Sequence, residues 1–255
     1  MLLRRHIMDE ERKETIDKMR NPALMRAKEK AVVLEAGEVA TVKGSFGKVA
    51  LLLFGLFAAT GVSCFMTIGG RTVIALVLLT FGVSMYIAFH PQYTAELSAP
   101  YVVLEGIVLG QIATIQERLH PGLGIQTLVI TFVIAAIVAA AYMFHWVEVN
   151  QVFKSSTFLA TIGIATVYVV DLVLMLGFDM QVPMIHENNW KGILASVLVI
   201  YVAARNLVWD LDDICTLSAK GLPKYYEWYF GFSLVITLIW LYVEIAQLLR
   251  KIARI

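Results

Sequence analysis

Seven long apolar runs constrain this chain more than any other feature of its sequence. The hydrocarbon core of a bilayer is about 30 Å thick, so a helix needs about 17–25 apolar residues to cross it. Runs of that length with few charges lie at about 48–68, 72–90, 99–116, 123–145, 156–178, 191–211 and 228–249. With 59% hydrophobic and 16% charged residues, and a mean hydropathy of +0.73, the chain is more apolar than soluble proteins. The sequence therefore predicts an all-α fold, a polytopic membrane helical bundle with seven transmembrane helices.

The charged residues divide the chain into two regions. The first 48 residues hold 11 of the 21 Lys and Arg and 8 of the 20 Asp and Glu. We therefore expect a charged, cytoplasmic N-terminal segment at 1–47 and a seven-helix transmembrane domain at 48–255, because basic residues near the first span favour the cytoplasm. Seven full spans then place the C-terminus outside, although its basic tail "RKIARI" would favour the inside. A re-entrant segment would bring both ends to the cytoplasm; we favour seven full spans, and the side of the C-terminus stays open.

The sequence argues against an enzyme. Cys64 and Cys215 are the two cysteines, which gives no disulfide or zinc framework. An intramembrane metal hydrolase needs histidines and carboxylates gathered around a metal. The histidines near predicted spans are instead scattered at span ends: His90, His120, His145 and His186. We expect no catalytic residues, no resident cofactor and no nucleic-acid partner.

Small residues predict where two helices approach closely. Lipid tails are as apolar as the helices, so helix association in membranes depends on close backbone contact and on polar bonds. Gly106 and Gly110 form a GxxxG pattern in the third run. We expect this face to pack tightly against a neighbouring helix.

Four acidic residues lie inside or at the edge of predicted spans: Glu105, Asp171, Asp210 and Glu244. An ionisable group at membrane depth is costly, so it usually faces the bundle interior, finds a partner and marks a pathway. For Asp171, a functional role and a polar contact that fixes two helices are equally open. For Glu105, a hydrogen bond to a neighbouring helix and a contact with an ion are equally open.

The stretch "RNLVWDLDDI" at 205–214 ends the sixth run with one arginine and three aspartates. At about 100° per residue, Arg205 and Asp212 are nearly eclipsed, whereas Asp210 and Asp213 share another stripe. We therefore expect Arg205 to neutralise Asp212 and Asp210 to find its partner on another helix. In the alternative interpretation, these aspartates lie in the cytoplasmic headgroup region.

A carboxylate pair is the chemistry that these acids could supply. Two carboxylates that meet in a low dielectric cannot both ionise easily, so they share a proton and form a latch that responds to pH. When deprotonated, they offer the oxygen ligands that a hard cation such as calcium prefers. We expect Asp210 and Glu244 to form this pair.

The last third of the chain resembles the Bax inhibitor-1 family, also called the transmembrane Bax inhibitor motif family, and specifically a bacterial branch. The similarity rests on "ARNLVWDLDDI" at 204–214 and "WLYVEIAQLLRKI" at 240–252. The segments "SAPYVVLEGIVLGQIATI" and "HPGLGIQTLVITFVIAAIVAAAY" extend it, so that it covers roughly residues 45–255.

The resemblance implies a seven-helix bundle with the last helix central, in a membrane expected to be the bacterial cytoplasmic (inner) membrane. It also implies a pH-dependent calcium leak gated by acids on the last two helices, here Asp210 and Glu244. The final acid is a glutamate where the family motif has an aspartate. The two acids also lie farther apart than in the motif, so Asp213 remains an alternative to Asp210 as the family aspartate.

Two functions therefore compete. The first is a pH-sensitive calcium or cation leak channel in the lipid bilayer, with Arg205 as a counter-ion. The second is a regulator without transport, which would bind a membrane protease or a stress or cell-death partner through residues 1–40. Ion selectivity, direction, resting state, oligomeric state and physiological role remain open at this level.

Overall fold

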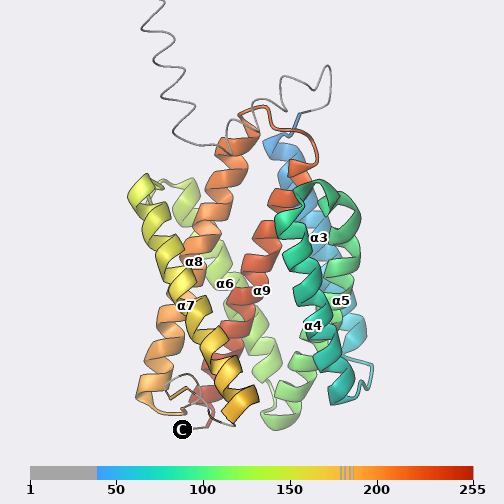
Figure 1. Cartoon of the computed structure of the whole chain (residues 1–255), viewed down its shortest axis with the longest axis vertical. Helices are drawn as coiled ribbons and strands as arrows, with labels where there is room; N and C mark the ends of the chain where they lie inside the picture. Colours follow the sequence, from blue (N-terminus) through green and yellow to red (C-terminus); the bar gives the residue numbers. More distant parts are fainter. Residues whose placement is uncertain (1–38, 179, 181, 184, 186, 255) are drawn as a thin grey trace, which may run out of the picture.

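Seven long helices form one bundle in the computed structural model, which describes residues 39–254 except 179, 181, 184 and 186 (Figure 1). The predicted N-terminal segment therefore lies mostly outside the described residues. A short 3-10 turn, η1 (Pro91–Tyr93), precedes the third helix. The helices are α3 (Val42–Ser63), α4 (Gly70–Phe89), α5 (Thr94–Leu119), α6 (Leu123–Met143), α7 (Gln151–Phe178), α8 (Trp190–Ser218) and α9 (Tyr226–Ile252).

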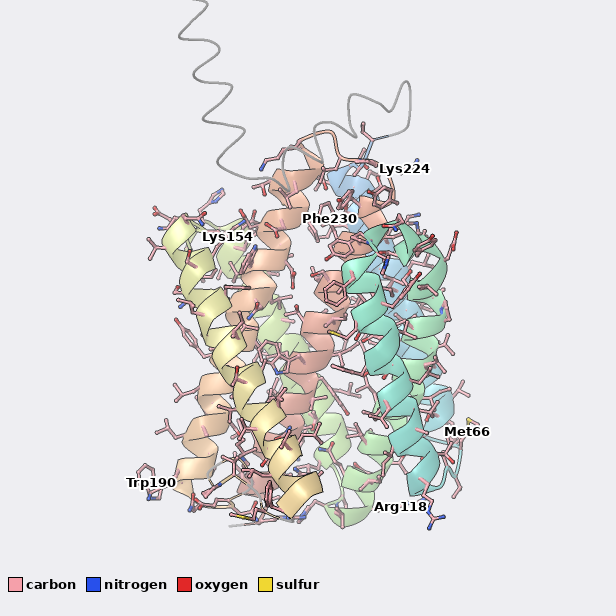
Figure 2. The ribbon with its side chains drawn as sticks, in the orientation of Figure 1. Met66, Arg118, Lys154, Trp190, Lys224 and Phe230 are labelled. Carbon is pink, nitrogen blue, oxygen red and sulfur yellow. The ribbon has the colours of Figure 1, made fainter. Side chains whose placement is uncertain are left out.

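All seven helices are long and apolar enough to cross a membrane, which confirms the predicted all-helical architecture. Successive helices run in opposite directions (Figure 1). Lys154 and Lys224 consequently lie at one end of the bundle, and Met66, Arg118 and Trp190 lie at the other (Figure 2). The start of α3 and the end of α9 therefore lie at opposite ends, as seven full spans require.

The last helix is central, as the family resemblance implies. Helix α9 packs against α3, α5, α6 and α8. Of the 18 residues in its apolar stretch, 56% are buried, the largest share of any span. Helix α7 is the opposite case, because none of the 18 residues in its apolar stretch is buried. Among the described helices, its close backbone contacts are with α8 alone. The bundle therefore has a well-packed centre and one peripheral helix.

The first helix begins at Val42, about one and two-thirds turns earlier than its apolar run predicts. Thr41 caps it by accepting a hydrogen bond from the backbone N–H of Gly44 at 2.9 Å. The buried carboxylate of Glu227, from the first turn of α9, accepts bonds from the N–H and hydroxyl of Thr41, both at 2.9 Å. A carboxylate at a helix N-terminus is favourable because of the helix dipole. A β-carbon on Gly44 would overlap the Glu227 carboxylate, so a larger residue there would displace this contact.

The GxxxG pattern packs α5 against α3, as predicted. A β-carbon on Gly106 would lie 2.6 Å from the β-carbon of Ala59 and 2.7 Å from the carbonyl oxygen of Leu56. A β-carbon on Gly110 would lie 2.6 Å from the carbonyl oxygen of Thr60. The backbones thus approach so closely that only glycine fits at both positions.

We predict that Gly106→Ala destabilises the protein by about 1–3 kcal/mol, because overpacking forces α3 and α5 apart. The free energy of unfolding, measured by denaturant titration in mixed micelles, checks this. Gly82→Ala on α4 is the matched control, since a β-carbon there meets nothing within 4 Å. Equal stability of the two variants would contradict close α3–α5 packing.

Candidate functional site

Asp210 lies on α8 and faces the central helix. Its Oδ1 accepts a hydrogen bond from the Ser233 hydroxyl at 2.8 Å, and its Oδ2 accepts one from the Thr237 hydroxyl at 2.5 Å. Both hydroxyls belong to α9, one turn apart, so they lie on the same side of that helix. The partly buried carboxylate therefore joins α8 to α9 through two charge-assisted bonds, which are stronger than neutral ones.

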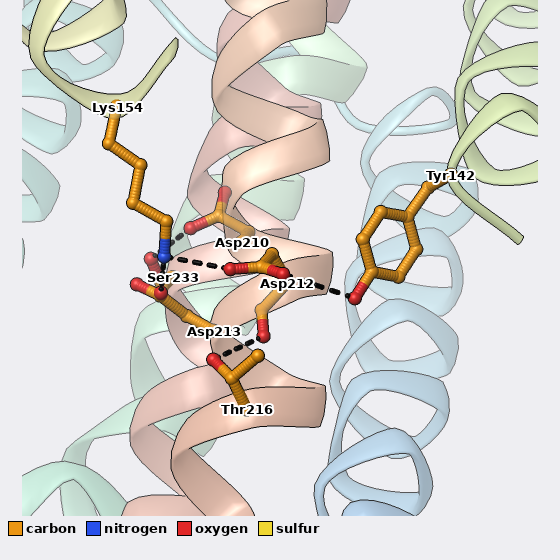
Figure 3. Close-up of polar contacts among 7 residues, drawn as sticks. All are labelled: Tyr142, Lys154, Asp210, Asp212, Asp213, Thr216 and Ser233. Carbon is orange, nitrogen blue, oxygen red and sulfur yellow. Dashed lines mark hydrogen bonds and ion pairs between the residues drawn. The ribbon is translucent and has the colours of Figure 1, made fainter. Parts of the chain in front are cut away.

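Asp212 and Asp213 face a different helix. Lys154, near the start of α7, forms ion pairs with Asp212 and Asp213, each at 2.8 Å (Figure 3). The Tyr142 hydroxyl of α6 donates to Asp212 at a longer 3.4 Å. This end of α8 is thus connected to α9 through Asp210 and to α7 through Asp212 and Asp213.

Arg205 also bonds to α7. Its guanidinium donates to the Thr157 hydroxyl at 3.0 Å, to the Ser156 hydroxyl at 2.7 Å and to the Phe153 carbonyl at 3.1 Å. Among the described residues no ion pair joins Arg205 to Asp212, so that predicted pairing is wrong. Helical phase brings the two residues to one face of α8, but the long guanidinium reaches acceptors on α7, and Lys154 neutralises Asp212.

Glu244 is buried near the other end of α9, with 2% of its surface exposed. Its Oε1 accepts hydrogen bonds from the Tyr168 hydroxyl of α7 at 2.6 Å and from the Trp240 indole at 3.1 Å. Lys251, one of the basic residues in the last two turns of α9, is also buried and bonds to the start of α8. Glu244 therefore connects the central helix to peripheral α7.

The remaining two predicted acids lie apart from these contacts. Asp171, on α7, accepts a hydrogen bond from the Val182 backbone N–H at 2.8 Å and so binds the chain that comes after its own helix. Glu105, on α5, lies against the Thr80 hydroxyl of α4. Val182 is not part of a helix, so this bond does not join Asp171 to a second helix, and both interpretations of each residue stay predictions.

A resident metal centre is not supported by this arrangement. Within the described part of the chain, no three His, Cys, Asp or Glu side chains gather closely enough to hold a metal ion. The oxygens around Asp210 are one carboxylate and two hydroxyls, which suit a transient contact with a hard cation.

Comparison with known proteins identifies the family. A family model described as Bax inhibitor 1 like matches residues 10–254, nearly the whole chain. The chain belongs to this family. No curated protein and no solved structure matches it.

In this Bax inhibitor 1-like protein, Asp210 and Glu244 do not meet. The hydroxyl partners of Asp210 are Ser233 and Thr237, and Glu244 lies 7–11 residues further along α9, about 10–16 Å at 1.5 Å per residue. Each acid lies eight residues from the end of its helix, Asp210 near one end of the bundle and Glu244 near the other. The carboxylate pair expected from the family is thus replaced by a carboxylate–hydroxyl contact.

Several partners in these contacts escaped the sequence analysis, among them Lys154, Tyr168, Glu227, Ser233 and Thr237. Lys154 sits in "QVFKSS", just before an apolar run, where a lysine ordinarily faces the headgroups. Tyr168 is one of many aromatic residues in the spans. A sequence signal existed only for Glu227, an acid in the first turn of the last apolar helix.

We predict that Lys154→Met lowers the free energy of unfolding by about 1–3 kcal/mol, because two partly buried carboxylates of α8 lose their only described counter-ion. Denaturant titration in mixed micelles measures the loss. Lys220→Met, at an exposed lysine beyond α8, is the control. In a background with Asp212→Asn and Asp213→Asn, Lys154→Met should cost much less; an undiminished cost would contradict the ion pairs.

Proposed function

We propose that this protein is a pH-sensitive calcium or cation leak of the membrane, closed by the contact between Asp210 and the hydroxyls of α9. The observation that carries the proposal is that a carboxylate at membrane depth joins the last two helices through Ser233 and Thr237. Membership of the Bax inhibitor 1-like family supports it. The proposal assigns no catalytic reaction to the chain.

Protonation would open this contact. While Asp210 is ionised, its charge strengthens both hydroxyl bonds and holds α8 against α9. As the pH falls, protonation removes that charge, and the contact between the two helices weakens. The leak should therefore rise at acidic pH and fall at alkaline pH.

A cavity next to the contact gives a cation space to enter. It has a volume of about 260 Å³, lies between α4 and α9, and includes Ser233 and Thr237 in its wall. When their bonds to Asp210 break on protonation, the hydroxyl oxygens and the neutral carboxyl oxygens become free beside this space. Oxygen ligands of this kind are the ones that calcium prefers.

The orientation of the protein is part of the proposal. The basic residues before and within the start of α3 favour a cytoplasmic N-terminus, in the cytoplasmic membrane of a bacterium. Asp210 then lies toward the cytoplasmic end and Glu244 toward the outer end. The regulator hypothesis depends on residues 1–40, which lie almost entirely outside the described residues, so it stays a prediction.

We predict that Asp210→Asn gives a high calcium leak that no longer varies with pH, because asparagine imitates the neutral, protonated acid. Calcium flux into proteoliposomes loaded with a fluorescent indicator, measured between pH 5.5 and pH 8.5, checks this. The double variant Ser233→Ala with Thr237→Val should likewise raise the leak at alkaline pH, because the charged carboxylate loses its donors.

Asp213→Asn is the matched control for Asp210→Asn, three residues away on the same helix. Since Asp213 faces Lys154 instead of α9, its pH profile should resemble that of the wild type. If Asp213→Asn flattens the profile and Asp210→Asn does not, Asp213 is the family aspartate. Absence of flux in the wild-type protein at every pH would refute the leak.

Glu244→Gln tests the carboxylate pair that the family resemblance implies. Because Glu244 and Asp210 have separate partners, we predict that this variant keeps the wild-type pH dependence of calcium flux. The same liposome assay measures it. A profile flattened as in Asp210→Asn would instead support coupled titration of the two acids.

A further inference from the structure

A second cavity lies between α7, α8 and α9, near the end of the bundle where α9 terminates. Its volume is about 520 Å³, within the range of about 300–1,000 Å³ that small-molecule sites occupy. Most of its wall is apolar. The polar side chains in the wall are Tyr168, Ser196, Glu244, Gln247 and Lys251.

This cavity is bordered by a buried acid and a buried base that make no direct contact with each other among the described residues. Glu244 is 2% exposed and Lys251 is 4% exposed. Among the described residues no ion pair of 4.0 Å or less joins them. They are seven residues apart, so both lie on the same side of α9, with Gln247 between them. The two charges attract each other only at longer range. A ligand that contacts both would stabilise them further, because buried charges without a direct partner are costly.

Each charged group also has bonding capacity left. The Lys251 ammonium donates to the Gly192 carbonyl at 3.0 Å and to the Ser196 hydroxyl at 2.8 Å, which uses two of its three hydrogens. Both hydrogen bonds that Glu244 accepts end on Oε1, so Oε2 accepts none from the described residues. The cavity thus offers one anionic acceptor and one cationic donor at separate points.

We infer that this cavity binds a free zwitterionic amino acid with an apolar side chain. The ammonium group of the ligand would bind Oε2 of Glu244, and its carboxylate would bind the third hydrogen of Lys251. Such a ligand is neutral overall, so it satisfies both buried charges without adding one. Its side chain would contact the apolar wall, which includes Ile164, Val167, Leu198 and Val199.

Other ligand classes fit the two charges less well. Lys251 repels a free metal cation, and Glu244 repels a simple anion. Phosphatidylethanolamine is also zwitterionic, but its phosphate lies nearer to its acyl chains than its ammonium does. Here the Cα atom of Glu244 lies about 10 Å deeper along α9 than that of Lys251, at 1.5 Å per residue. The longer lysine side chain reaches back toward the acid, so the two charged groups lie closer together than their backbones. A lipid that entered from the bilayer would therefore present its charges in the reverse order.

The inference goes beyond the proposed leak and does not rest on it. The hydrogen bonds of Glu244 and Lys251 end on Tyr168, Trp240 and the start of α8, none of which contacts the Asp210 carboxylate. The test of the cavity measures binding, whereas the test of the leak measures flux. Either proposal can therefore fail while the other holds.

The test is calorimetric titration of L-leucine into the full chain, reconstituted in nanodiscs of phosphatidylcholine, a lipid that carries no primary ammonium. We expect saturable binding that weakens about tenfold or more in Glu244→Gln and in Lys251→Met, because each removes a charge-assisted bond to the ligand. Glu105→Gln and Lys220→Met change an acid and a base outside the cavity wall, so they should bind leucine like the wild type.

Two analogues test the same contacts in the wild-type protein, so the result does not depend on whether a variant folds. L-leucinamide lacks the carboxylate and 4-methylpentanoate lacks the ammonium; each should bind about tenfold or more weaker than leucine. Lys251→Met should weaken leucine binding much more than leucinamide binding.

Three outcomes would overturn the inference. The first is no binding of L-leucine, L-valine or L-phenylalanine to the folded protein. The second is leucine binding that both analogues reproduce, or that Glu105→Gln weakens as strongly as Glu244→Gln does. The third is native mass spectrometry in which phosphatidylethanolamine occupies the protein, is lost in Glu244→Gln and is not displaced by leucine.

Discussion

The whole bundle depends on one constraint: a polar group at membrane depth must find its partner inside the protein. Helix α9 meets this constraint at three depths. Glu227 caps α3, the hydroxyls near its middle hold Asp210 of α8, and Glu244 accepts a bond from Tyr168 of α7. The central helix is therefore connected to three neighbours by carboxylate contacts in addition to its apolar packing, and these contacts help to hold it at the centre.

Helix α7 is held to the bundle with little apolar packing. Because none of the residues in its apolar stretch is buried, polar bonds contribute much of what holds this helix to the bundle. Lys154 and Tyr168 pair with acids, and Arg205 and Asn206 of α8 donate to residues of α7. Such bonds depend on protonation and on ligands in a way that apolar contacts do not. The peripheral helix is thus the part of the bundle whose position a pH change or a bound molecule can alter most.

Local pattern was sufficient to predict the helices, and long-range partners were not predictable from it. Run length predicted seven spans, and the GxxxG pattern predicted the close approach at Gly106, because both effects act within one or two helices. Helical phase placed Asp210 toward another helix but paired Arg205 with Asp212 wrongly, since phase cannot tell that α7 offers better partners. Likewise α3 begins before its apolar run because Glu227, from the distant start of α9, stabilises its first turn.

The separation of Asp210 and Glu244 changes what a leak through this fold requires. A cation that crosses the bundle along α9 would pass Asp210 near one end and the Glu244–Lys251 cavity near the other, and the buried ammonium of Lys251 opposes its passage there. A zwitterion in the cavity would cover that charge with its carboxylate and also bind Glu244, which contacts α7 through Tyr168. Ligand and proton would then act on different helix pairs, α7–α9 and α8–α9. Any coupling between them must pass through α9, the helix that both pairs share.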